Sequence, residues 1–184
     1  EIPYLYEAER SSYAQKFIQA PLAWIQQFAA VLQIKLNNLK GDGKEHEIYQ
    51  SASRIAVRLF LLTLFTSLVI FLLRGFIAET LFGLGKMPAE AATKLSYLIG
   101  LLTFSMPFTA MSLAYLKVFF TQGYIRQYVA IMLFVNAVSC IMYAISIFYW
   151  QENGYAFVYI LIEMLTTLII WLYLQKRLKR KVYY

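Results

Sequence analysis

Five long apolar blocks follow one another between Lys16 and Lys181, separated by short charged loops. A helix that crosses the bilayer core needs about 20 mainly apolar residues, and each block supplies roughly that length. Lipid offers no hydrogen bonds to the backbone, so such segments cross it as helices. The sequence therefore predicts an all-α, polytopic transmembrane helix bundle of about five spans. We place these spans at residues 16–36, 55–80, 93–117, 126–150 and 154–175.

The composition agrees with a membrane protein. Hydrophobic residues make up 60% of the 184 residues and charged residues only 15%, unlike an ordinary soluble domain. A net charge of +7 would also suit a nucleic-acid-binding protein. The basic residues, however, lie in loops and in one terminal cluster, not on a surface patch interleaved with aromatic residues. We therefore expect membrane lipids as partners and no nucleic acid.

The sequence offers no recognisable catalytic or metal-binding device. Cys140 is the single cysteine and lies inside an apolar block, and His46 is the single histidine and lies in a loop. One cysteine and one histidine far apart provide no intrachain disulfide and no zinc or haem site. Gly-rich phosphate loops and G-x-S-x-G elbows do not occur either. We expect no enzyme, no cofactor and no metal.

The loops alternate between rich and poor in Lys and Arg. Twelve of these residues fall in the loop after the first span, the turn after the third and the tail; five fall on the other side. The positive-inside rule therefore places the basic tail, residues 176–184, in the cytoplasm, and residues 1–15 outside as part of a periplasmic loop. An odd number of spans places the two ends of the chain on opposite sides of the membrane, which agrees with this assignment.

Glycine and proline mark where the helices turn or bend. Pro21 is expected to bend the first span, and Pro107 to kink the third, with Thr103 and Ser105 available to satisfy the freed carbonyl groups. Gly100 allows close helix approach. The predicted turns and breaks between spans lie at residues 41–43, 83–88, 123 and 151–154.

Polar residues gather on one side of the first span: Lys16, Gln19, Gln26, Gln27 and Gln33. At about 100° per residue, three glutamines lie roughly 60° to 100° from Lys16 on one side, and Gln27 about 20° on the other. Unpaired amides in hydrocarbon cost several kcal/mol. The amides therefore either hydrogen-bond to neighbouring helices or line a water-filled cavity, with Lys16 near its outer mouth to meet an anion. We favour the cavity and take these five as candidate substrate-binding residues.

Glu163 is the only acidic residue well inside a predicted span. A carboxyl group at membrane depth suggests a function, here ion coupling. The alternative is a helix interface in which Glu163 is protonated or bonded to a polar neighbour such as Asn136. Because no second acidic residue lies nearby, we favour the helix interface over ion coupling.

Four stretches, in this order, cover nearly the whole chain and carry a family resemblance: YAQKFIQAPLAWIQQFAAVL, RLFLLTLFTSLVIFLLRGFIAETLFGLGKM, MPFTAMSLAYLKVFFTQGYIRQ and FVNAVSCIMYAISIFYWQENGYAFVYILIEML. The series resembles the C-terminal half of a multidrug/oligosaccharidyl-lipid/polysaccharide exporter. Within that superfamily it is most similar to bacterial flippases for lipid-linked saccharides, of the polysaccharide type or the lipid II (MVF) type. The IEML segment favours the first branch, and QIKLN lacks a proline common in the second. Both branches stay open.

The resemblance implies one lobe of a two-lobed exporter in the bacterial inner membrane, moving a polyprenyl-pyrophosphate-linked saccharide without chemistry. The partner of this lobe would be a missing N-terminal half, and the start at Glu1 reads like the middle of a loop in a longer protein. Lys16 stands where the family carries Arg, which keeps the charge but loses the bidentate fork. The alternatives are an ion-coupled multidrug exporter of the same superfamily and a non-transporting membrane scaffold subunit.

Overall fold

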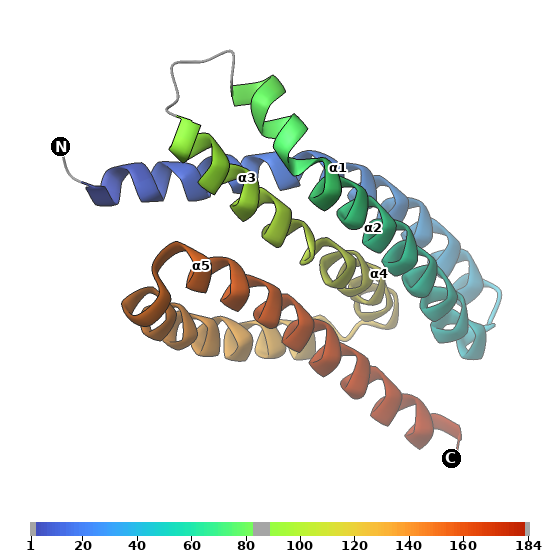
Figure 1. Cartoon of the computed structure of the whole chain (residues 1–184). Helices are drawn as coiled ribbons and strands as arrows, with labels where there is room; N and C mark the ends of the chain where they lie inside the picture. Colours follow the sequence, from blue (N-terminus) through green and yellow to red (C-terminus); the bar gives the residue numbers. More distant parts are fainter. Residues whose placement is uncertain (1–2, 83–88, 183–184) are drawn as a thin grey trace.

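The computed structural model describes residues 3–82 and 89–182, and every element within these ranges is an α-helix (Figure 1). The predicted all-α class is therefore confirmed. The helices are α1 (Pro3–Gly41), α2 (Glu45–Phe82), α3 (Ala89–Thr103), α4 (Met106–Gln122) and α5 (Ile125–Val182).

Within the described residues, four segments are long and apolar enough to cross a membrane: Glu45–Ile77, Thr93–Gln122, Ile125–Ser146 and Gly154–Arg177. They correspond to the second to fifth predicted spans. The first predicted span lies in α1, which is helical but is not among these four segments. Its passage through the membrane stays a prediction. Helix α1 continues through Pro21 and changes direction along its length (Figure 1).

Helix α5 folds back on itself, so its two limbs, residues 125–146 and 154–177, lie side by side (Figure 1). The rings of Tyr143 and Tyr155, one from each limb, stack with their centroids 5.4 Å apart. On a straight helix these residues would be about 18 Å apart along the axis. The reversal predicted at residues 151–154 is present, but the helical backbone continues through it.

The third span is interrupted between α3 and α4, directly before Pro107. Hydroxyl groups satisfy the carbonyl groups that the break releases. Ser105 donates to the carbonyl of Leu102 (2.7 Å), and Thr103 donates to a carbonyl of its own preceding turn (2.7 Å). Ser67 of α2 donates to the carbonyl of Thr103 (2.6 Å). The predicted kink is confirmed, but the carbonyl that Pro107 leaves without an N–H partner is that of Thr103, and its hydroxyl partner is Ser67 of α2 and not Thr103 or Ser105.

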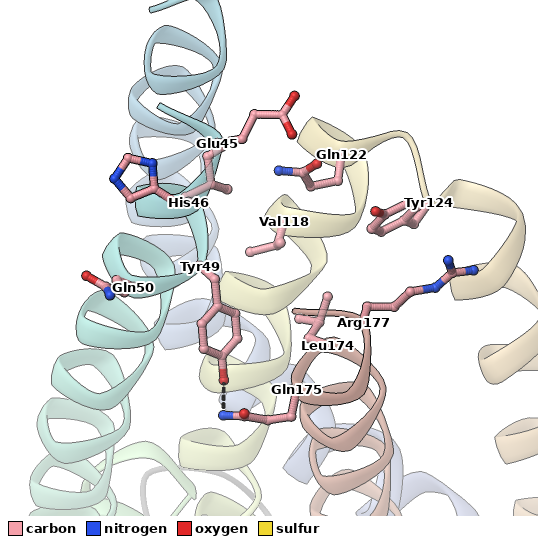
Figure 2. Close-up of a pocket in the computed structure, with 11 residues that line it drawn as sticks. Glu45, His46, Tyr49, Gln50, Val118, Gln122, Tyr124, Leu174, Gln175 and Arg177 are labelled. Carbon is pink, nitrogen blue, oxygen red and sulfur yellow. Dashed lines mark hydrogen bonds between the residues drawn. The ribbon is translucent and has the colours of Figure 1, made fainter. Parts of the chain in front are cut away.

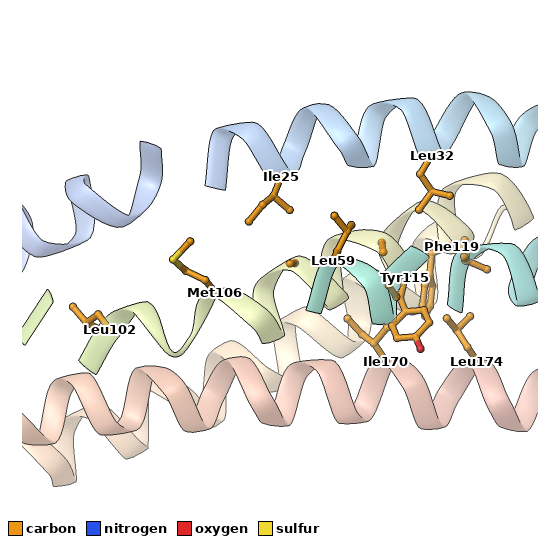
Figure 3. Packing of buried hydrophobic residues seen from close by; sticks show 14 of the residues in the cluster. Ile25, Leu32, Leu59, Leu102, Met106, Tyr115, Phe119, Ile170 and Leu174 are labelled. Carbon is orange, nitrogen blue, oxygen red and sulfur yellow. The ribbon is translucent and has the colours of Figure 1, made fainter. Parts of the chain in front are cut away.

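Helix α4 lies at the centre of the bundle and contacts α1, α2 and α5. Its largest fully buried side chains are Tyr115 and Phe119 (Figure 3). The Phe119 ring stacks on Tyr173 at 5.4 Å and meets Tyr128 edge-on at 5.6 Å. Because Tyr128 and Tyr173 belong to the two limbs of α5, one side chain of α4 holds both limbs.

Two glycines form turns with a left-handed backbone, which residues with a Cβ rarely adopt. Gly43 (φ 73°) lies between α1 and α2, and Gly123 (φ 77°) ends α4. The N–H of Tyr124 donates to the carbonyl of Phe119 (2.8 Å), which completes the C-terminal cap. The predicted turns at 41–43 and 123 are confirmed. The predicted break at 83–88 falls outside the described residues.

Gly100 permits the close approach of α3 and α2. A Cβ built there would lie 3.0 Å from side-chain atoms of both Arg74 and Phe71. We expect Gly100→Leu to lower the free energy of unfolding by about 1–3 kcal/mol through overpacking. Gly75→Leu is the matched control, since nothing lies within 4 Å of that position. Thermal unfolding in detergent measures both variants; equal stability of the two would contradict the predicted close contact.

Candidate functional site

Helix α1 buries one face against the bundle through Ile25, Ala29, Leu32 and Leu36. These residues recur at intervals of three and four, which is the spacing of one helical face. The predicted polar stripe occupies another part of the circumference. The packing of α1 therefore leaves the stripe beside or opposite the buried face.

The four stripe glutamines that the structure describes do not share one environment. Gln19, Gln26 and Gln27 are exposed, and Gln33 is half-buried. Lys16 lies on α1, but its side chain is outside the part that the structure describes. In the described part of the stripe, three amides are thus left on the surface of the bundle.

Gln33 makes the polar contact between α1 and α4. Its Nε2 donates to Oγ1 of Thr121 (2.8 Å) and to Oδ1 of Asn37 (3.1 Å). Lys40 lies two turns further along α1 and donates from Nζ to the carbonyl of Thr121 (2.6 Å). For Gln33 the packing interpretation is therefore the one that the geometry supports. Asn37 and Lys40 lie four and seven residues beyond Gln33, on the same helical face. This spacing could have predicted a polar contact here from the sequence.

Glu163 is half-buried in a pocket of about 200 Å³ between α4 and the two limbs of α5. Thr109 of α4 lines this pocket, and its hydroxyl donates to the carbonyl of Ser105 (3.2 Å). Ser112 and Asn136 line the same pocket, Asn136 from the opposite limb of α5. Glu163 thus lies at a helix interface with polar neighbours, which is the arrangement that the packing interpretation expected.

Thr167 joins the Glu163 turn of α5 to α4. Its hydroxyl lies 2.9 Å from the carbonyl of Phe108, 2.8 Å from the carbonyl of Glu163 and 2.7 Å from Oγ of Ser112. Phe108 directly follows Pro107, so the contact stands next to the break in the third span. The sequence showed these hydroxyl groups singly and did not show that they meet.

A larger hollow of about 560 Å³ opens between the start of α2 and the ends of α4 and α5 (Figure 2). We call it the α2–α4–α5 pocket; residues on its rim include Glu45, Gln122 and Arg177. Sequence reasoning missed it, because its lining residues come from three segments far apart in the sequence, 45–50, 118–124 and 174–177, and follow no motif. Among the described residues no group of three or more His, Cys, Asp or Glu side chains could hold a metal ion.

Several apolar helices long enough to cross a bilayer define the class of this chain as a multi-pass membrane protein. A family model described as lipid II flippase MurJ matches residues 10–183. The chain belongs to this family, which is the lipid II branch of the exporter superfamily that the sequence resembled, and its members are transporters and not enzymes. Comparisons with curated proteins and with solved structures gave no match. The polysaccharide branch gains no support.

The contact at Thr121 yields a stability prediction. Thr121→Val removes the hydroxyl that accepts from Gln33 and donates to Asn37, so the half-buried Gln33 amide keeps only its bond to Asn37 and loses its contact with α4. We expect the free energy of unfolding to fall by about 1–3 kcal/mol. Thr66→Val is the control, because the Thr66 hydroxyl donates to a carbonyl of its own helix. Chemical denaturation in detergent separates the two; a loss no larger than that of the control would remove Gln33 from the packing of α1.

Proposed function

We propose that this chain forms one lobe of a flippase that moves lipid II from the cytoplasmic to the outer leaflet of the bacterial inner membrane for peptidoglycan synthesis. The match of the lipid II flippase family over residues 10–183 carries this proposal. The substrate has a charged saccharide headgroup that cannot cross hydrocarbon unaided. A polar surface between two lobes would replace the water around the headgroup, and rocking of the lobes would alternate access to it.

The exposed side of α1 is the surface that we assign to the substrate path. Gln19, Gln26 and Gln27 lie there without burial in this lobe, and amides facing lipid would be costly. A second, N-terminal lobe opposite this side would enclose them with Lys16 in a water-filled path. We do not assign Gln33 to this surface, because its amide donates a hydrogen bond to Thr121 of α4.

The orientation follows from the distribution of charge. The α1–α2 turn and the α4–α5 turn carry basic residues, and the α5 end carries the basic tail. The positive-inside rule then places these turns and the C-terminus in the cytoplasm. Lys16, near the other end of α1, would meet the diphosphate close to the outer leaflet.

Lys16 gives the direct test of the substrate path. In the complete transporter reconstituted into vesicles, Lys16→Ala should lower the rate of lipid II flipping at least tenfold, because one charge-assisted contact to phosphate is lost. Lys16→Arg should keep the rate, since the guanidinium supplies the same charge with a bidentate fork. Lys35→Ala is the control, because this exposed lysine lies on the same helix but about 100° around the helix axis from Lys16. Unchanged flipping by Lys16→Ala with normal insertion would exclude the role.

We further propose that Glu163 couples transport to an ion. A cavity of about 200 Å³ beside a carboxyl group, with Thr109 and Ser112 on its wall, supports this role. If it holds, Glu163→Gln should abolish the dependence of flipping on a proton or sodium gradient while lipid II binding persists. Glu47→Gln, at an exposed carboxyl group, is the control. Full gradient dependence in Glu163→Gln would leave Glu163 with the packing role alone.

A further inference from the structure

Buried hydroxyl groups gather at one level of the bundle, around the break before Pro107. Ser67 of α2 and Thr167 of α5 reach the broken span there, at the carbonyl groups of Thr103 (2.6 Å) and Phe108 (2.9 Å). Six of the ten buried Ser and Thr side chains in the described part of the chain belong to these turns. We call them the hydroxyl layer: Thr63, Ser67, Thr103, Ser105, Thr166 and Thr167.

In α2 and α5 the hydroxyl groups of this layer also turn back onto their own helices. Thr63 donates to the carbonyl of Leu59 (2.6 Å), and the Ser67 hydroxyl lies 2.8 Å from the carbonyl of Thr63. Thr166 and Thr167 of α5 make the same bonds to carbonyl groups one turn back (2.7 and 2.8 Å). A hydroxyl that shares the carbonyl of a helical hydrogen bond loosens that turn and often bends the helix. Both helices therefore have a weakened turn at the hydroxyl layer.

Pro21 places a weak turn of α1 at the same level. Gln33 of α1 and Thr121 of α4 are hydrogen-bonded to each other, and the two helices run in the same direction (Figure 1). Pro21 precedes Gln33 by 12 residues, about 18 Å of helix. Pro107 precedes Thr121 by 14 residues, about 21 Å. Because proline removes an N–H from the helical ladder, α1 and the broken span are both weakened close to the hydroxyl layer.

On the side of the α1–α2 and α4–α5 turns, hydrogen bonds join the helices to one another. Nε2 of Gln33 donates to Oγ1 of Thr121 (2.8 Å), and Nζ of Lys40 donates to the carbonyl of Thr121 (2.6 Å). Nε2 of Gln175 donates to the hydroxyl of Tyr49 (2.8 Å), which joins α5 to α2 (Figure 2). We call this part of the lobe the inner half and the part beyond the hydroxyl layer the outer half. The bonds between helices make the inner half a firm base.

We propose that the hydroxyl layer is a hinge, at which the outer half of the lobe tilts on the inner half. The outer half comprises α3, α2 beyond Ser67, the reversal of α5, and α1 before Pro21, which carries Lys16. Ser67 and Thr167 serve as latches. Each hydroxyl has a second carbonyl on its own helix at 2.8 Å, so it stays hydrogen-bonded when its contact with the broken span opens. The hinge adds a motion within the lobe to the proposed rocking of the lobes, and it does not depend on the substrate.

Distances between spin labels test the hinge in the complete transporter in lipid nanodiscs, without substrate. The native cysteines, Cys140 included, are first replaced by serine. One label pair takes the positions of exposed Thr93 and Phe120 and spans the hydroxyl layer. The control pair takes the positions of exposed Val57 and Leu172, within the inner half. We expect a broad or two-peaked distance distribution for the first pair and a single narrow peak for the control. Equal widths for the two pairs would overturn the hinge.

Two variants act on the hinge in opposite directions. Pro107→Ala restores the N–H that pairs with the carbonyl of Thr103, and it should narrow the distribution of the pair across the layer to one peak. Ser67→Ala removes the latch to α2 and should broaden that distribution. Ser96→Ala is the matched control, since this buried serine donates to the carbonyl of Thr93 in its own helix (2.8 Å). A change in the control as large as that in Ser67→Ala, or an unchanged distribution in Pro107→Ala, would contradict a hinge at this level.

Flipping of lipid II in reconstituted vesicles shows whether transport uses the hinge. Pro107→Ala should lower the flipping rate about tenfold, because the straight span gains one hydrogen bond that the bent state lacks. Cooperative thermal unfolding in detergent reports that this variant is folded. Unchanged flipping by a folded Pro107→Ala protein with a narrowed distance distribution would contradict the use of the hinge in transport. A complete protein that moves no lipid II would instead overturn the transport proposal, while the label distances would still decide whether the hinge exists.

Discussion

Backbone polar groups have no water to bind inside a bilayer, and the rest of this structure depends on how the break before Pro107 is satisfied. Without a neighbour, the released carbonyl groups would stay unpaired in a medium where each costs several kcal/mol. The Ser67 hydroxyl pairs with the carbonyl of Thr103 and the Thr103 hydroxyl with that of Gly100, which removes this cost. Because Ser67 belongs to α2, the repair also fixes α2 against the broken span. Helix α4 begins directly after this break, and α1, α2 and α5 all pack on it.

Polar side chains elsewhere in the bundle also need hydrogen-bond partners in the membrane. Some of them find these partners within this lobe, whereas others stay exposed on its surface. Thr167 finds partners on α4, and Glu163 lines a pocket together with Thr109 and Ser112 of the same helix. Gln33 finds Thr121, whereas Gln26 and Gln27 stay exposed on α1. This contrast separates amides that hold the lobe together from amides left for another surface. It is the reason that α1 combines a packing face with a side suited to a polar substrate.

The helical class, the second to fifth spans, the turns at Gly43 and Gly123 and the interruption at Pro107 could be predicted, because each depends on local hydrophobicity or backbone geometry. The branch of the superfamily was not predictable from QIKLN or IEML, which are short and weakly specific, and the family match over residues 10–183 decided it. The partner of Gln33 and the α2–α4–α5 pocket were not predictable either. Both arise where segments far apart in the sequence meet, and periodicity along one helix carries no information about such meetings.

The reversal within α5 has a mechanical consequence. A flexible loop would let its two limbs slide past each other, but a helical connection has no slack to absorb such a shift. Phe119 already touches both limbs, and Thr167 fixes the second limb to α4. The two limbs and α4 are therefore cross-linked at two levels, and we expect Tyr128 and Tyr173 to move together with Phe119 and not independently.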